Sequence, residues 1–259
     1  MTRPAAARPP SRARAWPPRG ARLLLAVPQR EPLSAPLVGA LAVLGGVVAG
    51  WLVVGVEVLA QGPFAALAGF AWRGYHILPT WLPGADVSLE GSHGAFAWAV
   101  LLLSGPFAVL VVGFVVHALA EGLAAPPPVR VVAFEFFAIA WLQVPLLLIA
   151  AGAPGGAGPV STLYERLGEP ESGRWAAVAL GGLALLGIAR LVGEQAVAVG
   201  GTWLRVDGRE FRRRIALLFA AYPFAGAVAV AAFERAFGPP LLPLAGVVLV
   251  GVVVWVRTP

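Results

Sequence analysis

The sequence predicts an all-α, polytopic membrane protein with about six transmembrane helices and both termini in the cytoplasm. Its 259 residues are 59% hydrophobic and only 12% charged, whereas soluble domains carry about 25% charged residues. The apolar residues stand in long runs, and about 20 such residues cross the hydrocarbon core of a bilayer. The arginines gather mostly at one side of these runs, which is the asymmetry that orients membrane proteins.

The chain is expected to divide into a tail and one membrane domain. Residues 1–31 are rich in Arg and Pro and bury too little apolar surface to offset their ordering entropy, so we expect a disordered cytoplasmic tail. Residues 32–259 are expected to form a single helical transmembrane domain, because apolar segments follow one another there with short connections. The predicted spans are 37–60, 94–120, 131–152, 175–199, 215–233 and 240–256.

Small residues and a proline inside the first two spans predict how these spans pack. Ala42, Gly46 and Gly50 recur every four residues and form a stripe that another helix can approach closely. Pro106 lies inside the second span and predicts a bend. The Ser104 hydroxyl or a neighbouring helix is expected to satisfy the carbonyl group that this proline leaves unbonded.

The longest connection inside the membrane domain, residues 61–93, is the least regular part. Its segment 64–72 is apolar but too short to span, which favours a re-entrant or interfacial helix. Three aromatic residues there suit the headgroup level of a bilayer: Trp72, Tyr75 and Trp81. Four others are of metal-binding types, but their spacing matches no zinc motif, so a solvated loop is the favoured interpretation: His76, Asp86, Glu90 and His93.

Arginine positions set the predicted orientation and location. With the N-terminus in the cytoplasm, most arginines lie on the inner side, including those of a basic hairpin at 200–214. Because these arginines flank apolar spans, their expected partner is the lipid bilayer with its anionic headgroups, and not nucleic acid. We therefore predict a multi-pass protein of the plasma membrane. The abundance of Ala, Gly, Pro and Arg is typical of a GC-rich, bacterial coding sequence, which favours a bacterial inner membrane.

Five ionisable residues lie near the predicted inner ends of three spans, and we expect them to converge there. They are His117, Glu121, Glu135, Arg190 and Glu194. The favoured interpretation is structural, with Arg190 pairing Glu194 or Glu121 and joining the helices. The alternatives are a proton or ion path, since buried charges usually pair or line a wet cavity, and a divalent metal held by the histidine and two of the carboxylates. Glu57 is expected on the opposite side, apart from this cluster, where it needs a partner or water.

No reactive motif indicates an enzyme. The chain has no Cys, and it lacks a nucleophile elbow, a phosphate-binding loop and a His-Glu-x-x-His zinc motif. We therefore predict no catalytic residues, no bound metal and no cofactor. The favoured function is a non-catalytic scaffold or accessory subunit of a membrane assembly, with another membrane protein as its partner. The alternative from a different class is a small permease or a proton- or ion-coupled carrier that uses the polar cluster.

Three short segments resemble the site-2 protease family of intramembrane zinc metalloproteases. Residues 56–60, Val-Glu-Val-Leu-Ala, close the first span where that family carries His-Glu-x-x-His. Ser-Gly-Pro at 104–106 is similar to the family's Gly-Pro helix, and Pro-Gly-Gly at 154–156 falls where the family has its Asp-Gly segment. Val56 and Ala60 replace both zinc-binding histidines, so the resemblance implies an inactive, degenerate relative in which only Glu57 matches a family role, that of the general base.

Overall fold

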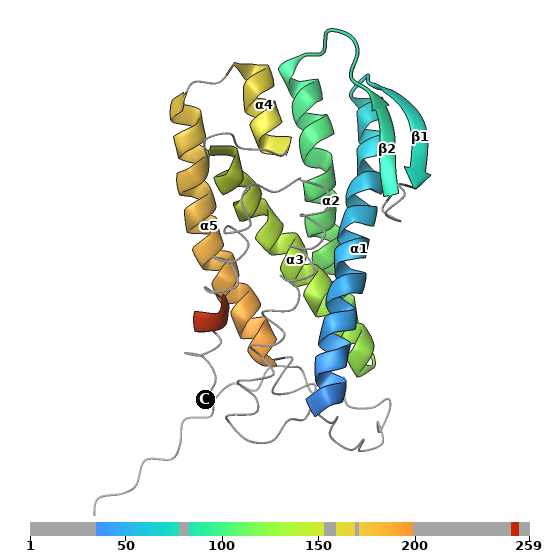
Figure 1. The fold of residues 1–259 in the computed structure, drawn as a ribbon, viewed down its shortest axis with the longest axis vertical. Helices are drawn as coiled ribbons and strands as arrows, with labels where there is room; N and C mark the ends of the chain where they lie inside the picture. Colours follow the sequence, from blue (N-terminus) through green and yellow to red (C-terminus); the bar gives the residue numbers. More distant parts are fainter. Residues whose placement is uncertain (1–34, 78–82, 153–158, 169–170, 199–249, 254–259) are drawn as a thin grey trace, which may run out of the picture. The chain divides into compact units, whose positions relative to one another are not determined.

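The computed structural model describes residues 35–77, 83–152, 159–168, 171–198 and 250–253. Figure 1 shows the elements in chain order. They are helix α1 (Ala35–Leu67), strands β1 (Ala71–Ile77) and β2 (Pro83–Ser88), and helices α2 (Ala95–Gly122), α3 (Pro127–Gly152), α4 (Pro159–Leu167) and α5 (Glu171–Ala198). Residues 250–253 are also helical.

Helices α1, α2, α3 and α5 are long and apolar enough to cross a membrane. They confirm a mainly helical, membrane-type fold over the first four predicted spans. The fifth predicted span, 215–233, lies outside the described residues, as do the tail 1–31 and the basic hairpin 200–214. Of the sixth span, 240–256, the structure describes only 250–253.

Helix α3 is the centre of the described helices. It contacts α1, α2, α4 and α5, and 72% of its apolar segment is buried, against 33–44% for the other three long helices. The outward faces of those three helices carry large apolar side chains, among them Phe96, Phe107 and Trp175. Such faces are a liability in water but suit helices that lipid surrounds.

Small residues let the helices approach α3 closely. Gly113 of α2 lies against Ala140, and Gly181 of α5 lies against the carbonyl oxygen of Pro145, so that a Cβ added at either glycine would come within 3 Å of these atoms (2.9 and 2.8 Å). Close backbone approach of this kind is how helices pack in lipid, where the hydrophobic effect between them is absent. The small stripe expected in the first span is also buried: Ala42, Gly46 and Gly50.

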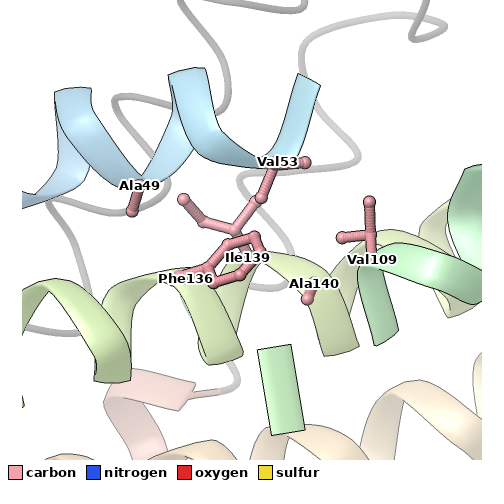
Figure 2. Packing of buried hydrophobic residues seen from close by; sticks show 6 residues of the cluster. All are labelled: Ala49, Val53, Val109, Phe136, Ile139 and Ala140. Carbon is pink, nitrogen blue, oxygen red and sulfur yellow. The ribbon is translucent and has the colours of Figure 1, made fainter. Parts of the chain in front are cut away.

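A layer of apolar side chains fills the contact between α1, α2 and α3 (Figure 2). We call it the apolar layer. All of its members are less than 9% exposed and none is polar. They are Ala49 and Val53 of α1, Val109 of α2, and Phe136, Ile139 and Ala140 of α3.

The connection between the first two spans corrects the all-α prediction. Residues 71–77 and 83–88 form an antiparallel β-hairpin with an irregularity between Trp72 and Gly74. The apolar residues from Phe64 to Leu67 continue α1, so they form no separate re-entrant or interfacial helix. Tryptophan, tyrosine and isoleucine favour strands, and this signal in residues 71–77 is what the span-based prediction overlooked.

Helix α1 passes through Pro63 because the hairpin supplies a missing hydrogen bond. A proline inside a helix has no N–H and leaves the carbonyl group four residues earlier without its helical partner. That carbonyl belongs to Leu59, and the Tyr75 hydroxyl donates to it at 2.7 Å. Trp72 packs beside it, because a Cβ on Gly62 would meet the indole ring and the Tyr75 hydroxyl. The hairpin is thereby attached to α1.

Helix α2 likewise continues through Pro106. The Ser104 hydroxyl donates to the carbonyl oxygen of Leu101 at 3.1 Å. The carbonyl that Pro106 leaves without a helical donor is that of Leu102, four residues before the proline. The Ser104 hydroxyl therefore does not bond the carbonyl group that was expected, but the one before it in the chain.

Candidate functional site

Glu135 is the most deeply buried acid among the described residues. Its exposed fraction is 0%, and it lies on α3, the helix that the others surround. Its carboxyl group points at α1, where a Cβ on Gly45 would collide with Oε2, and Val131 of α3 lies beside the same glycine. Gly45 thus leaves the space that the carboxyl group fills.

Neither carboxyl oxygen of Glu135 has a hydrogen-bond partner in the part of the chain that the structure describes. An ionised carboxylate buried in an apolar medium is costly unless it is paired. Ionisable groups inside membrane spans are therefore rare, and they usually mark a path for protons, ions or substrates. By this criterion Glu135 is the leading candidate for a functional group.

His117 is buried on the other side of α3. Its ring, 8% exposed, stacks on Phe137 with ring centroids 4.7 Å apart and meets Phe134 edge-on at 6.3 Å. The side chain of Gln195 on α5 is a hydrogen-bond partner, so His117 links α2, α3 and α5. Because successive residues of a helix point about 100° apart, Phe134 can face His117 while Glu135 faces α1.

The remaining residues of the predicted cluster lie at the surface. Glu121 is exposed in the last turn of α2. Arg190 donates to Glu194 at 3.1 Å, with the two side chains 65% and 42% exposed. This ion pair lies within α5, so the pair by itself joins no two helices. The five residues therefore divide into two buried groups on different faces of α3 and an exposed set.

Glu57 is part-buried and occupies a second polar site, where it has the partner that the sequence analysis expected it to need. Gln143 of α3 donates from Nε2 to Glu57 Oε2 at 3.2 Å. On α2, a Cβ at Gly105 would meet Glu57 Cγ at 2.5 Å and Gln61 Nε2 at 3.3 Å. Glu57 therefore lies where α1, α2 and α3 meet. We refer to Glu57 and Gln143 as the upper pair.

The structure places Glu57 deeper in its helix than the sequence predicted. The predicted first span, 37–60, set Glu57 near its end. Because the Tyr75 hydroxyl takes the carbonyl of Leu59, α1 continues to Leu67, and Glu57 lies well inside the apolar helix. The signal that could have found the pair is Gln143, an amide in the middle of an otherwise apolar span.

The four metal-binding residue types of the first connection do not form a metal site. His93 stacks on Phe70 with centroids 3.9 Å apart, and its Nε2 lies 3.1 Å from the Glu90 carbonyl oxygen. Both His76 and Asp86 are exposed on the hairpin. Across the described ranges, no group of three His, Cys, Asp or Glu side chains is placed to hold a metal ion, and this applies also to His117, Glu121 and Glu135.

Comparison with protein-family models, with curated proteins and with solved structures gives no match. The resemblance to the site-2 protease family therefore stays a prediction. In the structure the one matching residue, Glu57, is bonded to the amide of Gln143, with Val56 and Ala60 at the positions of the family's histidines.

Proposed function

We propose that this protein is a membrane permease that carries protons, with Glu135 as its intramembrane acid. The observation that supports this most strongly is a fully buried carboxyl group, on the central helix, with no hydrogen-bond partner among the described residues. Such a group costs free energy in a purely structural role, whereas a proton carrier needs an ionisable group in the hydrocarbon region.

The surroundings of Glu135 favour a proton over a metal cation. Hard cations need several oxygen ligands, but among the described residues no group of three His, Cys, Asp or Glu side chains is placed to hold a metal ion. Gly45 and Val131, which lie beside this carboxyl group, offer no side-chain oxygen. A carboxyl group that has taken up a proton is neutral and tolerates an apolar site. It can release the proton when water or a counter-charge reaches it. Binding and release at Glu135 would be the elementary step of transport.

The proposal includes six spans in the plasma membrane, with both termini in the cytoplasm. Alternating directions of the described helices support this arrangement: α1 and α3 run parallel, because Gly45 contacts Glu135 and Glu57 contacts Gln143. The arginines of the tail and of the hairpin 200–214 would then bind anionic headgroups on the inner side. A reporter fused within 200–214 is expected to report the cytoplasm, and a periplasmic signal there would overturn this orientation.

The test of transport uses the full chain in lipid vesicles that contain a trapped, pH-sensitive dye. A potassium gradient with valinomycin sets the interior negative and drives protons inward. We expect faster acidification than in protein-free vesicles, and a loss of about 100-fold of the added flux in Glu135→Gln, the scale of a lost proton-transfer group. Glu194→Gln removes an exposed carboxylate and serves as the matched control, with flux close to that of the unaltered protein.

Two results would overturn the proposal. One is an acidification rate no faster than in protein-free vesicles, and the other is equal flux in Glu135→Gln and the unaltered protein. Either would leave the scaffold or accessory subunit as the better hypothesis, because that function requires no proton movement.

A further inference from the structure

Two carboxyl groups, that of buried Glu135 and that of part-buried Glu57, lie along the same contact between helices α1 and α3. Glu135 faces Gly45 at one level, and Glu57 bonds Gln143 at another. Glu135 and Gln143 are eight residues apart on α3, and at 1.5 Å per residue this separates the two levels by about 12 Å. Both levels lie within the apolar spans of α1 and α3.

The apolar layer lies between these two levels, as the order of its residues along α1 and α3 shows. On α1, Ala49 and Val53 stand between Gly45 and Glu57, and on α3, Ile139 stands between Glu135 and Gln143. Their side chains are 0%, 6% and 8% exposed. A proton transfer needs donor and acceptor oxygens about 2.5–3.0 Å apart, so the resting structure blocks direct transfer between the carboxyl groups.

The two acids differ in the partners that the helices offer them. At the upper pair, an amide N–H donates to the carboxyl oxygen of Glu57, and hydrogen bonds of this kind stabilise a carboxylate. Gly105 lets α2 close over the same side chain. At Glu135 no donor is present among the described residues. The upper pair therefore stabilises a carboxylate at Glu57, whereas the site of Glu135 only accommodates a carboxyl group.

We propose that Glu57, positioned by Gln143, is the second proton-binding site of the permease and that the apolar layer is the gate between the two sites. In the transfer step the O–H bond at Glu135 breaks, the proton moves through water admitted to the layer, and an O–H bond forms on Glu57. The negative charge passes from Glu57 to Glu135 in the same step. Release of the proton from Glu57 on one side of the membrane and uptake of a proton by Glu135 from the other side restore the starting state. This inference rests on the proposed proton transport.

The decisive experiment compares Glu57→Gln with Glu135→Gln in the vesicle assay described above. We expect each to lower the added flux by about 100-fold, with partial recovery in Glu57→Asp, which restores a carboxyl group. Modification of Glu135 by dicyclohexylcarbodiimide, measured in Glu57→Gln by mass spectrometry, shows that the helices around Glu135 are intact. If Glu57→Gln keeps its flux while Glu135→Gln loses it, this inference fails and the proposed function stands. If Glu135→Gln keeps its flux, the proposed function fails.

A second variant tests the gate without touching either acid. Ile139→Ser places a hydroxyl group in the apolar layer and is expected to admit water and raise the flux about tenfold, which corresponds to a barrier lower by about 1.4 kcal/mol. The matched control is Leu183→Ser, which makes the same kind of change on an exposed face of α5. Flux that is unchanged or lower in Ile139→Ser would overturn the role of the layer as a gate.

Discussion

Helices α3 and α5 each carry a glutamate within an apolar span, in opposite surroundings. Glu194 of α5 is 42% exposed at its side chain and bound to Arg190. Glu135 of α3 is fully buried, and within the described residues its oxygens have no donor. An exposed ion pair contributes little to stability, whereas a buried, unpaired acid is costly and calls for a function. Glu135 and Glu194 are the same residue type, so it is their surroundings that make Glu135 the functional candidate.

The largest expected difference between these acids is chemical reactivity. Dicyclohexylcarbodiimide is apolar, enters the bilayer and reacts with carboxylic acid groups. We expect it to modify Glu135, which lies in apolar surroundings, and to leave Glu194, which is exposed and bound to Arg190. Mass spectrometry of peptides from protein labelled in vesicles gives the extent of modification at each site.

Glu135→Gln is the control for this labelling, because it removes the reactive group and keeps the shape of the side chain. The peptide that contains residue 135 should then carry no label. Labelling of Glu194 to the same extent as Glu135 would contradict this prediction, since it would show that burial does not distinguish the reactivity of the two carboxyl groups.

The next largest effect is expected at the glycine that makes room for Glu135. Gly45→Val adds atoms where the carboxyl group lies, and overpacking of this kind costs about 1–3 kcal/mol. Gly55→Val is the matched control on the same helix, because nothing lies within 4 Å of a Cβ at that position. Denaturant titration in mixed micelles measures the free energy of unfolding of both variants.

Adding Glu135→Ala to Gly45→Val tests whether the two residues compete for one space. The alanine vacates that space, so the double variant should regain part of the lost stability, as expected for residues in contact. Equal losses at Gly45 and Gly55, or simple additivity in the double variant, would contradict the contact.

The sequence predicted the four described spans well because each is a long apolar run, and length and composition alone decide whether a helix can cross a bilayer. It also marked Glu135 as an ionisable residue inside such a run. What it could not provide is the direction of each side chain. Glu135 and His117 were expected together, but they face different neighbours across α3.

The depth of Glu57 in its helix was misjudged for a different reason. Helix α1 continues through Pro63 to Leu67, where the Tyr75 hydroxyl donates to the carbonyl oxygen of Leu59, 16 residues away in the chain. Such a tertiary contact leaves no local pattern in the sequence. The contact between Arg190 and Glu194, in contrast, could be predicted from the sequence. Two residues four apart on a helix are neighbours wherever the helix lies.

A smaller effect is expected where the hairpin attaches to α1. Tyr75→Phe removes the donor to the Leu59 carbonyl, and the loss of one such hydrogen bond costs about 0.5–1.5 kcal/mol. Tyr164→Phe on α4 is the control for removing a tyrosine hydroxyl. Hydrogen exchange of the β1 and β2 amides is expected to speed up in Tyr75→Phe alone, and equal exchange in both variants would argue against the attachment.

The same contact has a predicted pH dependence. Burial raises the pKa of Tyr75 above its ordinary value of 10.0. A raised pKa in the folded state favours the neutral phenol, so its contribution to stability is complete below pH 10 and is lost as the pH rises through the folded pKa. Hydrogen exchange in the hairpin, corrected for the intrinsic rate, should therefore increase at strongly alkaline pH. The increase should be absent in Tyr75→Phe.

The smallest effect is expected at Glu194, the exposed acid of α5. Glu194→Gln breaks the ion pair with Arg190, and exposed pairs four residues apart on a helix contribute about 0.3–0.5 kcal/mol. The same micelle titration should therefore find a change near its limit of precision, and less at high salt because exposed charges are screened. A loss above about 2 kcal/mol would show that Glu194 holds helices together, and the distinction drawn between Glu135 and Glu194 would then fall.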